Sequence, residues 1–151
     1  MELIKKTLPT AARLFLGLLF TVFGLNGFFG FLPMPPTTEA GGAFLGALAS
    51  TGYMFPLIKG TEVVAGLLLL SGRFVPLALT LLAPVTVNIL LFHIVLAPSP
   101  AMPLAIVAAQ IFLAYRHRAS FAGVLRASDP EPTKEPLGYS DHVVGEGAPA
   151  H

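Results

Sequence analysis

The sequence predicts an all-α fold, a polytopic membrane four-helix bundle with a short interfacial or re-entrant helix between the first and second spans. Only 11% of the residues are charged and 54% are hydrophobic, whereas a soluble domain typically carries about 25% charged residues. Most of the charges lie near the two ends of the chain. The sequence between them contains apolar runs long enough to cross a bilayer.

The first span is expected over about residues 9–30. Pro9 suits the first turn of a helix, because its missing N–H costs nothing there. The apolar run from Ala11 to Leu32 is too long for a signal peptide and has no cleavage site, so we interpret it as a retained span. Several small residues of this span share one face and would let another helix approach closely: Gly17, Gly24 and Gly27.

A break and a short apolar segment follow the first span. Three prolines within residues 31–42 cannot continue the helix. Residues 41–54 are apolar but too short to span. They form either an interfacial or re-entrant helix over the bundle or a surface helix that only joins two spans.

Three further spans are expected over about residues 55–71, 74–96 and 102–115. The connection between the first two of these is only residues 71–73, so the helices must be antiparallel neighbours. Pro84 should kink the longest of the three. The membrane domain then covers residues 1–126. Residues 127–151 are rich in Pro, Glu, Gly and Asp, and we expect a disordered cytoplasmic tail.

Basic residues set the predicted orientation, because they favour the cytoplasmic side of short connections. They flank the start of the first span, the second turn and the end of the last span: Lys5, Lys6, Arg13, Arg73, Arg116, Arg118 and Arg126. The first and third connections contain no Lys or Arg. We therefore expect four spans in the cell inner (plasma) membrane with both termini cytoplasmic. Arg13 is assigned only this topological role.

Glu62 is central to the functional interpretation. It lies inside the second span, where a carboxylate costs about 2.5–3.5 kcal/mol and is retained when it has a partner or a task. A rise of about 1.5 Å per residue places it roughly 10 Å below the outer surface. Lys59 lies one turn above it on the same face.

The other spans contribute polar side chains to the same outer half of the bilayer: Asn26, Asn88, His93 and Gln110. Charged residues in spans usually face the bundle interior. We therefore expect a polar cavity around Glu62 that opens outward, with residues 41–54 as its lid. Simpler roles stay open: an intrahelical pair for Lys59, hydrogen bonds between helices for the three amides, and an ordinary hydrogen-bonded His93.

The sequence also excludes several classes of protein. Without Cys, this chain has no disulfide, thiolate catalysis or Cys-ligated cluster. No nucleophile–base pair, metal-ligand spacing or phosphate-binding loop appears, so we expect no catalytic or metal site and no stand-alone enzyme. His142 and His151 are interpreted as solvated. The net charge of +1 argues against nucleic acid as a partner.

The first two spans resemble the start of DoxX-like membrane proteins. In RLFLGLLFTVFGLNGFFGF the matching residues are Arg13, Gly17, Phe20 and Gly24. The family's next Lys falls on Gly27, so that cation is absent. In EVVAGLLLLSGRFVPLAL the family's intramembrane acid falls on Glu62 and its turn Arg on Arg73. Asn88 and His93 resemble positions in a DoxX-like subset, and the likeness covers roughly residues 10–118.

This resemblance implies a four-helix membrane bundle that works with other proteins. The family takes its name from a subunit linked to thiosulfate:quinone oxidoreductase, and other members are thought to be partners of redox or detoxifying enzymes. It points to an accessory or quinone/lipophile-binding subunit of a membrane redox or detoxification system. The expected ligand is a quinone, with no covalent cofactor. The expected contacts are membrane lipid and a membrane or peripheral redox partner, and a homo-oligomer stays open.

Two other functions stay open. One is a structural or assembly membrane protein with no chemistry of its own. The other is a small proton-coupled transporter with an intramembrane acid. Against the transporter, the polar residues favour one side of the bilayer, whereas transport needs access from both sides.

Cysteine labelling tests the predicted topology, because the chain has no native Cys. Single cysteines at residues 73 and 140 are expected to react with an impermeant maleimide only from the cytoplasmic side. Cysteines at residues 35 and 100 are expected to react only from outside. Labelling of residue 73 from outside would contradict the topology.

Overall fold

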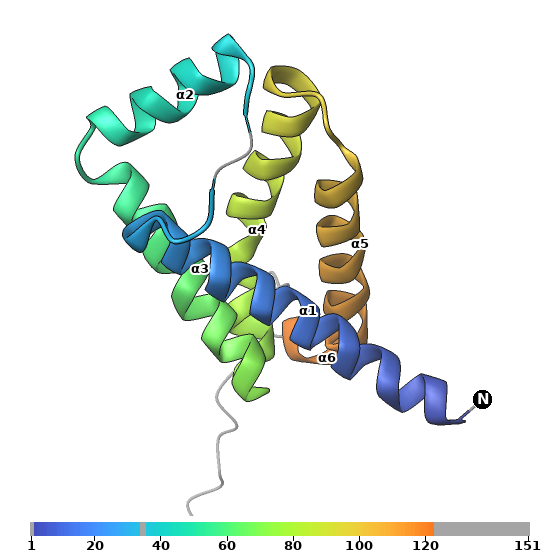
Figure 1. Cartoon of the computed structure of the whole chain (residues 1–151). Helices are drawn as coiled ribbons and strands as arrows, with labels where there is room; N and C mark the ends of the chain where they lie inside the picture. The colour runs from blue at the N-terminus through green and yellow to red at the C-terminus, as the bar shows by residue number, and fades with distance from the viewer. Residues whose placement is uncertain (1, 34–35, 123–151) are drawn as a thin grey trace, which may run out of the picture.

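The computed structural model describes residues 2–33 and 36–122, and these residues form helices without any strand. The predicted all-α class is therefore confirmed for this part of the chain, and the predicted tail at 127–151 lies outside it. Figure 1 shows the elements in order: α1 (Glu2–Phe29), α2 (Glu39–Ser50), α3 (Met54–Ser71), α4 (Val75–Leu91), η1 (Phe92–Leu96), α5 (Ala101–Arg116) and α6 (Arg118–Phe121).

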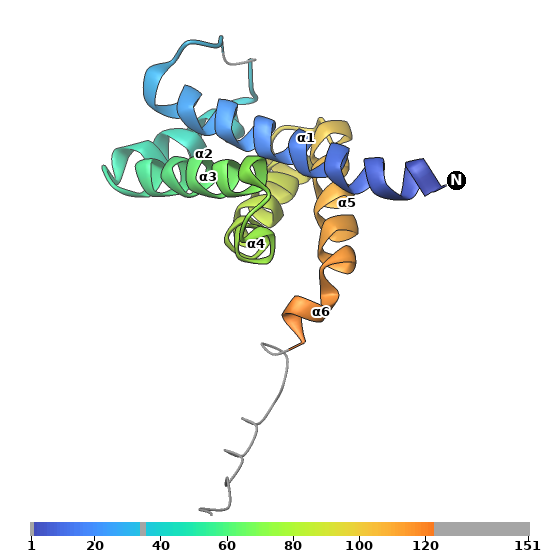
Figure 2. The ribbon, with the colours of Figure 1, turned by 90° about the horizontal axis from the view of Figure 1, so that it is seen from below.

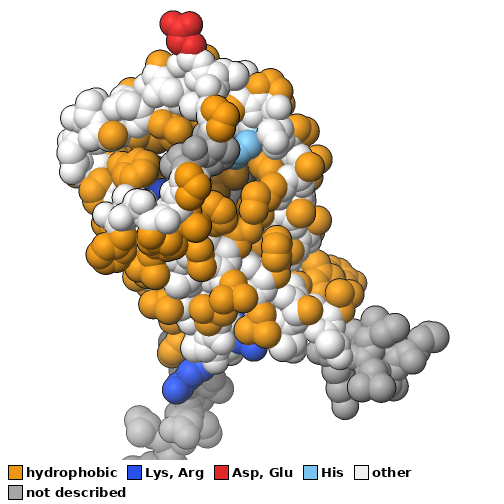
Figure 3. Space-filling model, in the orientation of Figure 1, with side chains coloured by type: hydrophobic (Ala, Val, Ile, Leu, Met, Phe, Trp, Pro, Cys, Tyr) orange, Lys and Arg blue, Asp and Glu red, His pale blue; other side chains and the backbone are white. Residues whose placement is uncertain are grey.

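Within the described residues, three helical segments are long and apolar enough to cross a bilayer: Thr7–Phe29, Met54–Ser71 and Val75–Leu96. α5 is apolar but shorter, at 16 residues. Hydrophobic side chains are spread over the face seen in Figure 3, where few charged side chains are visible. The length and composition of these helices indicate a membrane protein, as predicted.

Two helix starts differ from the expectation. α1 begins at Glu2, so Pro9 lies inside the helix rather than in its first turn. Pro lacks an N–H group, so this position cannot donate the usual backbone bond to the preceding turn. α2 runs from Glu39 to Ser50 instead of over 41–54. The reason for its early start is Thr38, whose side chain accepts a hydrogen bond from Gly41 N at 3.0 Å and caps the helix.

α1 and α3 pack side by side with their backbones in close contact (Figures 1 and 2). A Cβ atom added to Gly66 would lie 2.7 Å from Thr21 N and 3.0 Å from Gly17 O. One added to Gly24 would lie 3.0 Å from Val63 N. The predicted close approach at the glycine face of the first span is therefore confirmed, with α3 as the partner.

The remaining helices complete a closed ring of neighbours. α4 packs against α3 and α5, and α5 also contacts α1. The buried hydrophobic residues lie between these four helices: Leu16, Phe20, Ala65, Leu69, Val75, Ala78, Leu79, Leu82, Ile106 and Leu113. α2 stands apart from this core and touches α3 and η1 (Figure 1).

Arg13 has a structural role beyond the topological one assigned from the sequence. Its Nη1 donates hydrogen bonds to Leu69 O at 2.6 Å and to Leu70 O at 3.2 Å. Carbonyls in the last turn of a helix lack the usual intrahelical partners. Leu69 O also accepts from Gly72 N at 3.1 Å, and the guanidinium of α1 adds its bonds to the end of α3. The sequence could not show this role, because Arg13 and Leu69 are 56 residues apart and meet only in the folded chain.

Substitution of the α3 glycines tests this packing. We expect Gly66→Ala to destabilise the protein by about 1–3 kcal/mol, because the new methyl group meets backbone atoms of α1 that cannot move aside. Gly60→Ala on the same helix is the matched control. A Cβ there meets nothing within 4 Å, so its stability should be unchanged or raised. Thermal unfolding in detergent measures both, and equal midpoints would contradict the packing.

Candidate functional site

Glu62 lies against α1 and is buried, with 3% of the residue's surface exposed. Its carboxylate binds Lys59 Nζ, at 2.8 Å from Oε2 and 3.1 Å from Oε1. Lys59 Nζ also lies 5.8 Å from the centre of the Phe55 ring, within range of a cation–π contact. The predicted i, i+3 pair therefore forms within α3.

The glycines of α1 close over this ion pair. A Cβ added to Gly24 would lie 3.1 Å from Glu62 Cβ, and one added to Gly27 would lie 2.5 Å from Lys59 Cγ. The stem of Lys59 thus occupies the space where a side chain at position 27 would begin. Position 27 therefore has no room for a larger side chain, and the cation beside Glu62 comes from α3.

Asn26 and Gln110 are also buried, but both bind backbone rather than Glu62. Asn26 Oδ1 accepts a hydrogen bond from Leu32 N at 2.6 Å, and its Nδ2 donates to Leu32 O at 3.3 Å. Gln110 Nε2 donates to Leu79 O at 3.0 Å and joins α5 to α4. Within residues 2–33 and 36–122, Lys59 is the only hydrogen-bond partner of the Glu62 side chain.

His93 lies in η1, a π-helical turn that the sequence analysis did not predict. Its Nδ1 hydrogen bonds to Ile89 O at 2.8 Å, and its ring meets the Phe92 ring edge-on at 5.2 Å. The ring nitrogen is therefore engaged by its own helix. Single π-helical turns often occur at functional sites, so the segment itself bears on the site even though His93 does not reach Glu62.

The expected polar cavity around Glu62 is therefore not formed by the predicted set of residues. Glu62 and Lys59 meet each other, while Asn26, His93 and Gln110 each bind a backbone carbonyl or amide near their own helix or its neighbour. Asn88 is exposed on α4. These residues lie on different helices, and the face that each helix turns toward its neighbours decides what its polar side chain meets, so the depth predicted from the sequence did not bring them together.

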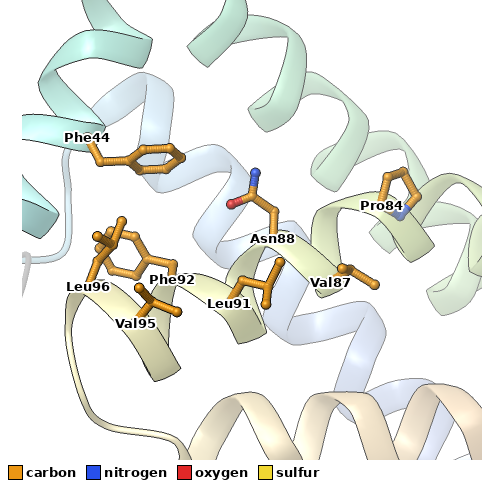
Figure 4. A pocket seen from close by; sticks show the side chains of 8 residues that line it. All are labelled: Phe44, Pro84, Val87, Asn88, Leu91, Phe92, Val95 and Leu96. Carbon is orange, nitrogen blue, oxygen red and sulfur yellow. The ribbon is translucent and has the colours of Figure 1, made fainter.

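An open groove of about 580 Å³ lies between α2 and the α4–η1 helix (Figure 4). Eight residues line it: Phe44, Pro84, Val87, Asn88, Leu91, Phe92, Val95 and Leu96. Asn88 is the one polar side chain among them. Figure 4 shows its amide pointing from α4 into the groove, with Phe44 of α2 on the far side.

The Asn88 amide makes no hydrogen bond to any other residue of the described chain. An amide has two donors and an acceptor with two lone pairs, and leaving them unmade in an apolar environment costs free energy. Apolar walls with one converging polar group are typical of sites for small lipophilic molecules. The arrangement can hold a hydrocarbon body and hydrogen bond one uncharged head group.

Comparisons with protein-family models, curated proteins and solved structures found no match to this chain. The resemblance to DoxX-like proteins therefore stays a prediction from the residues of the first two spans.

A double-mutant cycle tests the buried pair. We expect Lys59→Met to destabilise the protein by on the order of 3 kcal/mol, because it leaves a buried carboxylate without its partner. Glu62→Leu should cost less, since Lys59 is 20% exposed and its ammonium can extend to the head groups. The double variant should cost less than the two single effects summed. Additive effects on unfolding in detergent would show that the two residues do not interact.

Proposed function

We propose that this protein binds a neutral lipophile in the membrane as an accessory subunit of a redox or detoxification system. The observation that supports this most is the single Asn88 amide in an otherwise apolar groove. An amide exposed to hydrocarbon needs a partner, because no water is present there to supply one. A carbonyl or hydroxyl group on a lipophilic ligand would be that partner.

The proposed membrane arrangement is a four-span bundle with both termini cytoplasmic, in the inner (plasma) membrane. α5 would be the fourth span: its 16 residues extend about 24 Å at 1.5 Å per residue, somewhat less than the roughly 30 Å hydrocarbon core. Its contacts with α1 and α4 support that assignment. In this orientation α2 and the groove lie towards the outer leaflet, where a lipophile can enter from the lipid.

The proposed ligand class includes quinones, which the DoxX-like resemblance implies. An Asn amide donates to a quinone carbonyl and accepts from a quinol hydroxyl, so one side chain serves both redox states. The ligand would exchange electrons with a partner protein, because this chain has no Cys and thus no thiol redox relay.

The ion pair takes a supporting role in this proposal. Lys59 and Glu62 satisfy each other and pack against the glycines of α1. A pair within one helix makes no bond to the neighbouring helix, but it gives the buried carboxylate its partner. The proposed contribution of Glu62 and Lys59 is therefore a mutually satisfied surface on which the glycines of α1 pack.

A structural or assembly protein is the second candidate, and one observation favours it. The half-buried Arg13 and the buried Asn26 and Gln110 all hydrogen bond to backbone groups of another element or connection. Such bonds hold a membrane protein together without any ligand. This alternative does not explain why the Asn88 amide faces the groove without a protein partner in the described residues.

Titration of the full chain in lipid nanodiscs with a decyl-tailed benzoquinone separates the two candidates. We expect saturable binding to the wild type and about tenfold weaker binding to Asn88→Leu, since one hydrogen bond is lost. Asn88→Leu should also raise the unfolding temperature without ligand, because an unpaired amide is removed from an apolar surface.

Thr61→Val is the control for this titration. Its hydroxyl already donates to Leu57 O at 2.9 Å on the same helix and lies outside the groove lining. It should bind the quinone as the wild type does. Absence of saturable binding to the wild type, or equal affinity of Asn88→Leu, would rule out this site.

A further inference from the structure

We propose that α2 is a hinged lid over the groove and that a hydrogen bond from Thr38 to the end of η1 holds it closed. This inference rests on the proposed function, because it takes the groove as the binding site and concerns how a lipophile enters and leaves it.

The lid is held to the rest of the protein by few contacts. Gly41 is its one buried residue. Phe44 packs on Phe92, with ring centres 5.9 Å apart and planes tilted by 44°. A Cβ added to Gly41 would lie 3.2 Å from Phe92 Cζ. The Phe92 ring is therefore one of the contacts that hold α2, together with the contact to α3, and elements with few buried contacts open at low cost.

Thr38 is the latch. Its hydroxyl accepts from Gly41 N at 3.0 Å and donates to Leu96 O, the last carbonyl of η1. A hydroxyl has one donor and two acceptor positions, so it can make both bonds at once. Thr38 thus joins the start of the lid to the end of the third apolar helix, and Leu96 also lines the groove.

A glycine hinge lies at the other end of the lid. Gly52 follows α2 with a φ of +75°, which glycine adopts without steric cost. A Cβ at Gly52 would meet nothing within 4 Å, and the turn is held by local hydrogen bonds from Gly52 N to Ala49 O at 3.1 Å and from Met54 N to Thr51 Oγ1 at 3.0 Å. Hinges are short segments that absorb backbone rotation while helices stay rigid. α3 begins two residues later at Met54.

The lid borders the part of the groove where the ligand head would bind. In Figure 4, Phe44 of α2 lies across the groove from Asn88. Release of the Thr38 bond would let α2 swing about Gly52 and carry Phe44 away from Phe92. Closure would then hold a bound lipophile between Phe44 and Asn88, and opening would set its rate of exchange with the lipid.

Distance measurements between spin labels test the lid directly. Labels at Ala47→Cys on α2 and Leu104→Cys on α5 report its position, because both sites are exposed and the chain has no other Cys. Thr38→Asp keeps the acceptor that caps α2 but loses the donor to Leu96 O. Thr38→Ser keeps both and is the matched control. Pulsed electron paramagnetic resonance on the full chain in nanodiscs gives the distances.

We expect the wild type and Thr38→Ser to share one dominant distance. Thr38→Asp should add a longer distance with an open population raised about two- to tenfold, the effect of losing one hydrogen bond. The decyl-tailed benzoquinone should dissociate from Thr38→Asp faster by a similar factor. Phe44→Leu leaves the helix cap intact and removes the ring contact with Phe92, so it should also lengthen the distances. It provides the test if Thr38→Asp folds poorly.

The outcomes separate this inference from the proposed function. Identical distances in Thr38→Asp, Phe44→Leu and Thr38→Ser overturn the lid, even where the quinone binds. Longer distances in Thr38→Asp and Phe44→Leu support the lid, even where the quinone does not bind and the proposed function fails.

Discussion

The close approach of α1 and α3 is the constraint on which the rest of the structure depends. In lipid, helices gain little from burying apolar surface against each other, so tight backbone packing and polar contacts must hold them together. Gly17, Gly24 and Gly66 supply that packing, because a Cβ at any of them would overlap the facing helix. The same approach buries Glu62 and brings Arg13 to the end of α3.

This constraint divides the polar side chains of the apolar helices into two groups. Arg13, Asn26 and Gln110 hydrogen bond to backbone, and Lys59 and Glu62 satisfy each other. These bonds hold the fold, although Gln110 Oε1 is buried without a hydrogen-bond partner in the described part of the chain. Asn88 alone among the predicted site residues faces an open groove without a protein partner in the described chain. Glu62, the charged residue that is most conspicuous in the sequence, is thus less available to a ligand than the uncharged Asn88.

The groove lies between α2 and the α4–η1 helix, away from the contact between α1 and α3. α4 and η1 form one wall and α2 the other, and the Phe44–Phe92 ring contact and the Thr38 hydrogen bond connect them. A rigid ring of four helices beside a lightly held fifth is a suitable arrangement for a protein that exchanges a ligand with the bilayer. Rigid helices position Asn88, and the light contact of α2 lets the groove open.

The sequence alone determined the helical class, the apolar segments and the Lys59–Glu62 pair, because hydropathy, proline breaks and i, i+3 spacing are local properties. The tertiary structure decided which way each remaining polar residue faces. Asn88 and Gln110 are both amides within apolar helices, and the sequence pattern does not distinguish them. In the structure Asn88 lies exposed in a groove, whereas Gln110 donates to Leu79 O. The orientation of a helix about its own axis is set by its neighbours, and in an almost uniformly apolar helix the pattern of residues marks no single buried face.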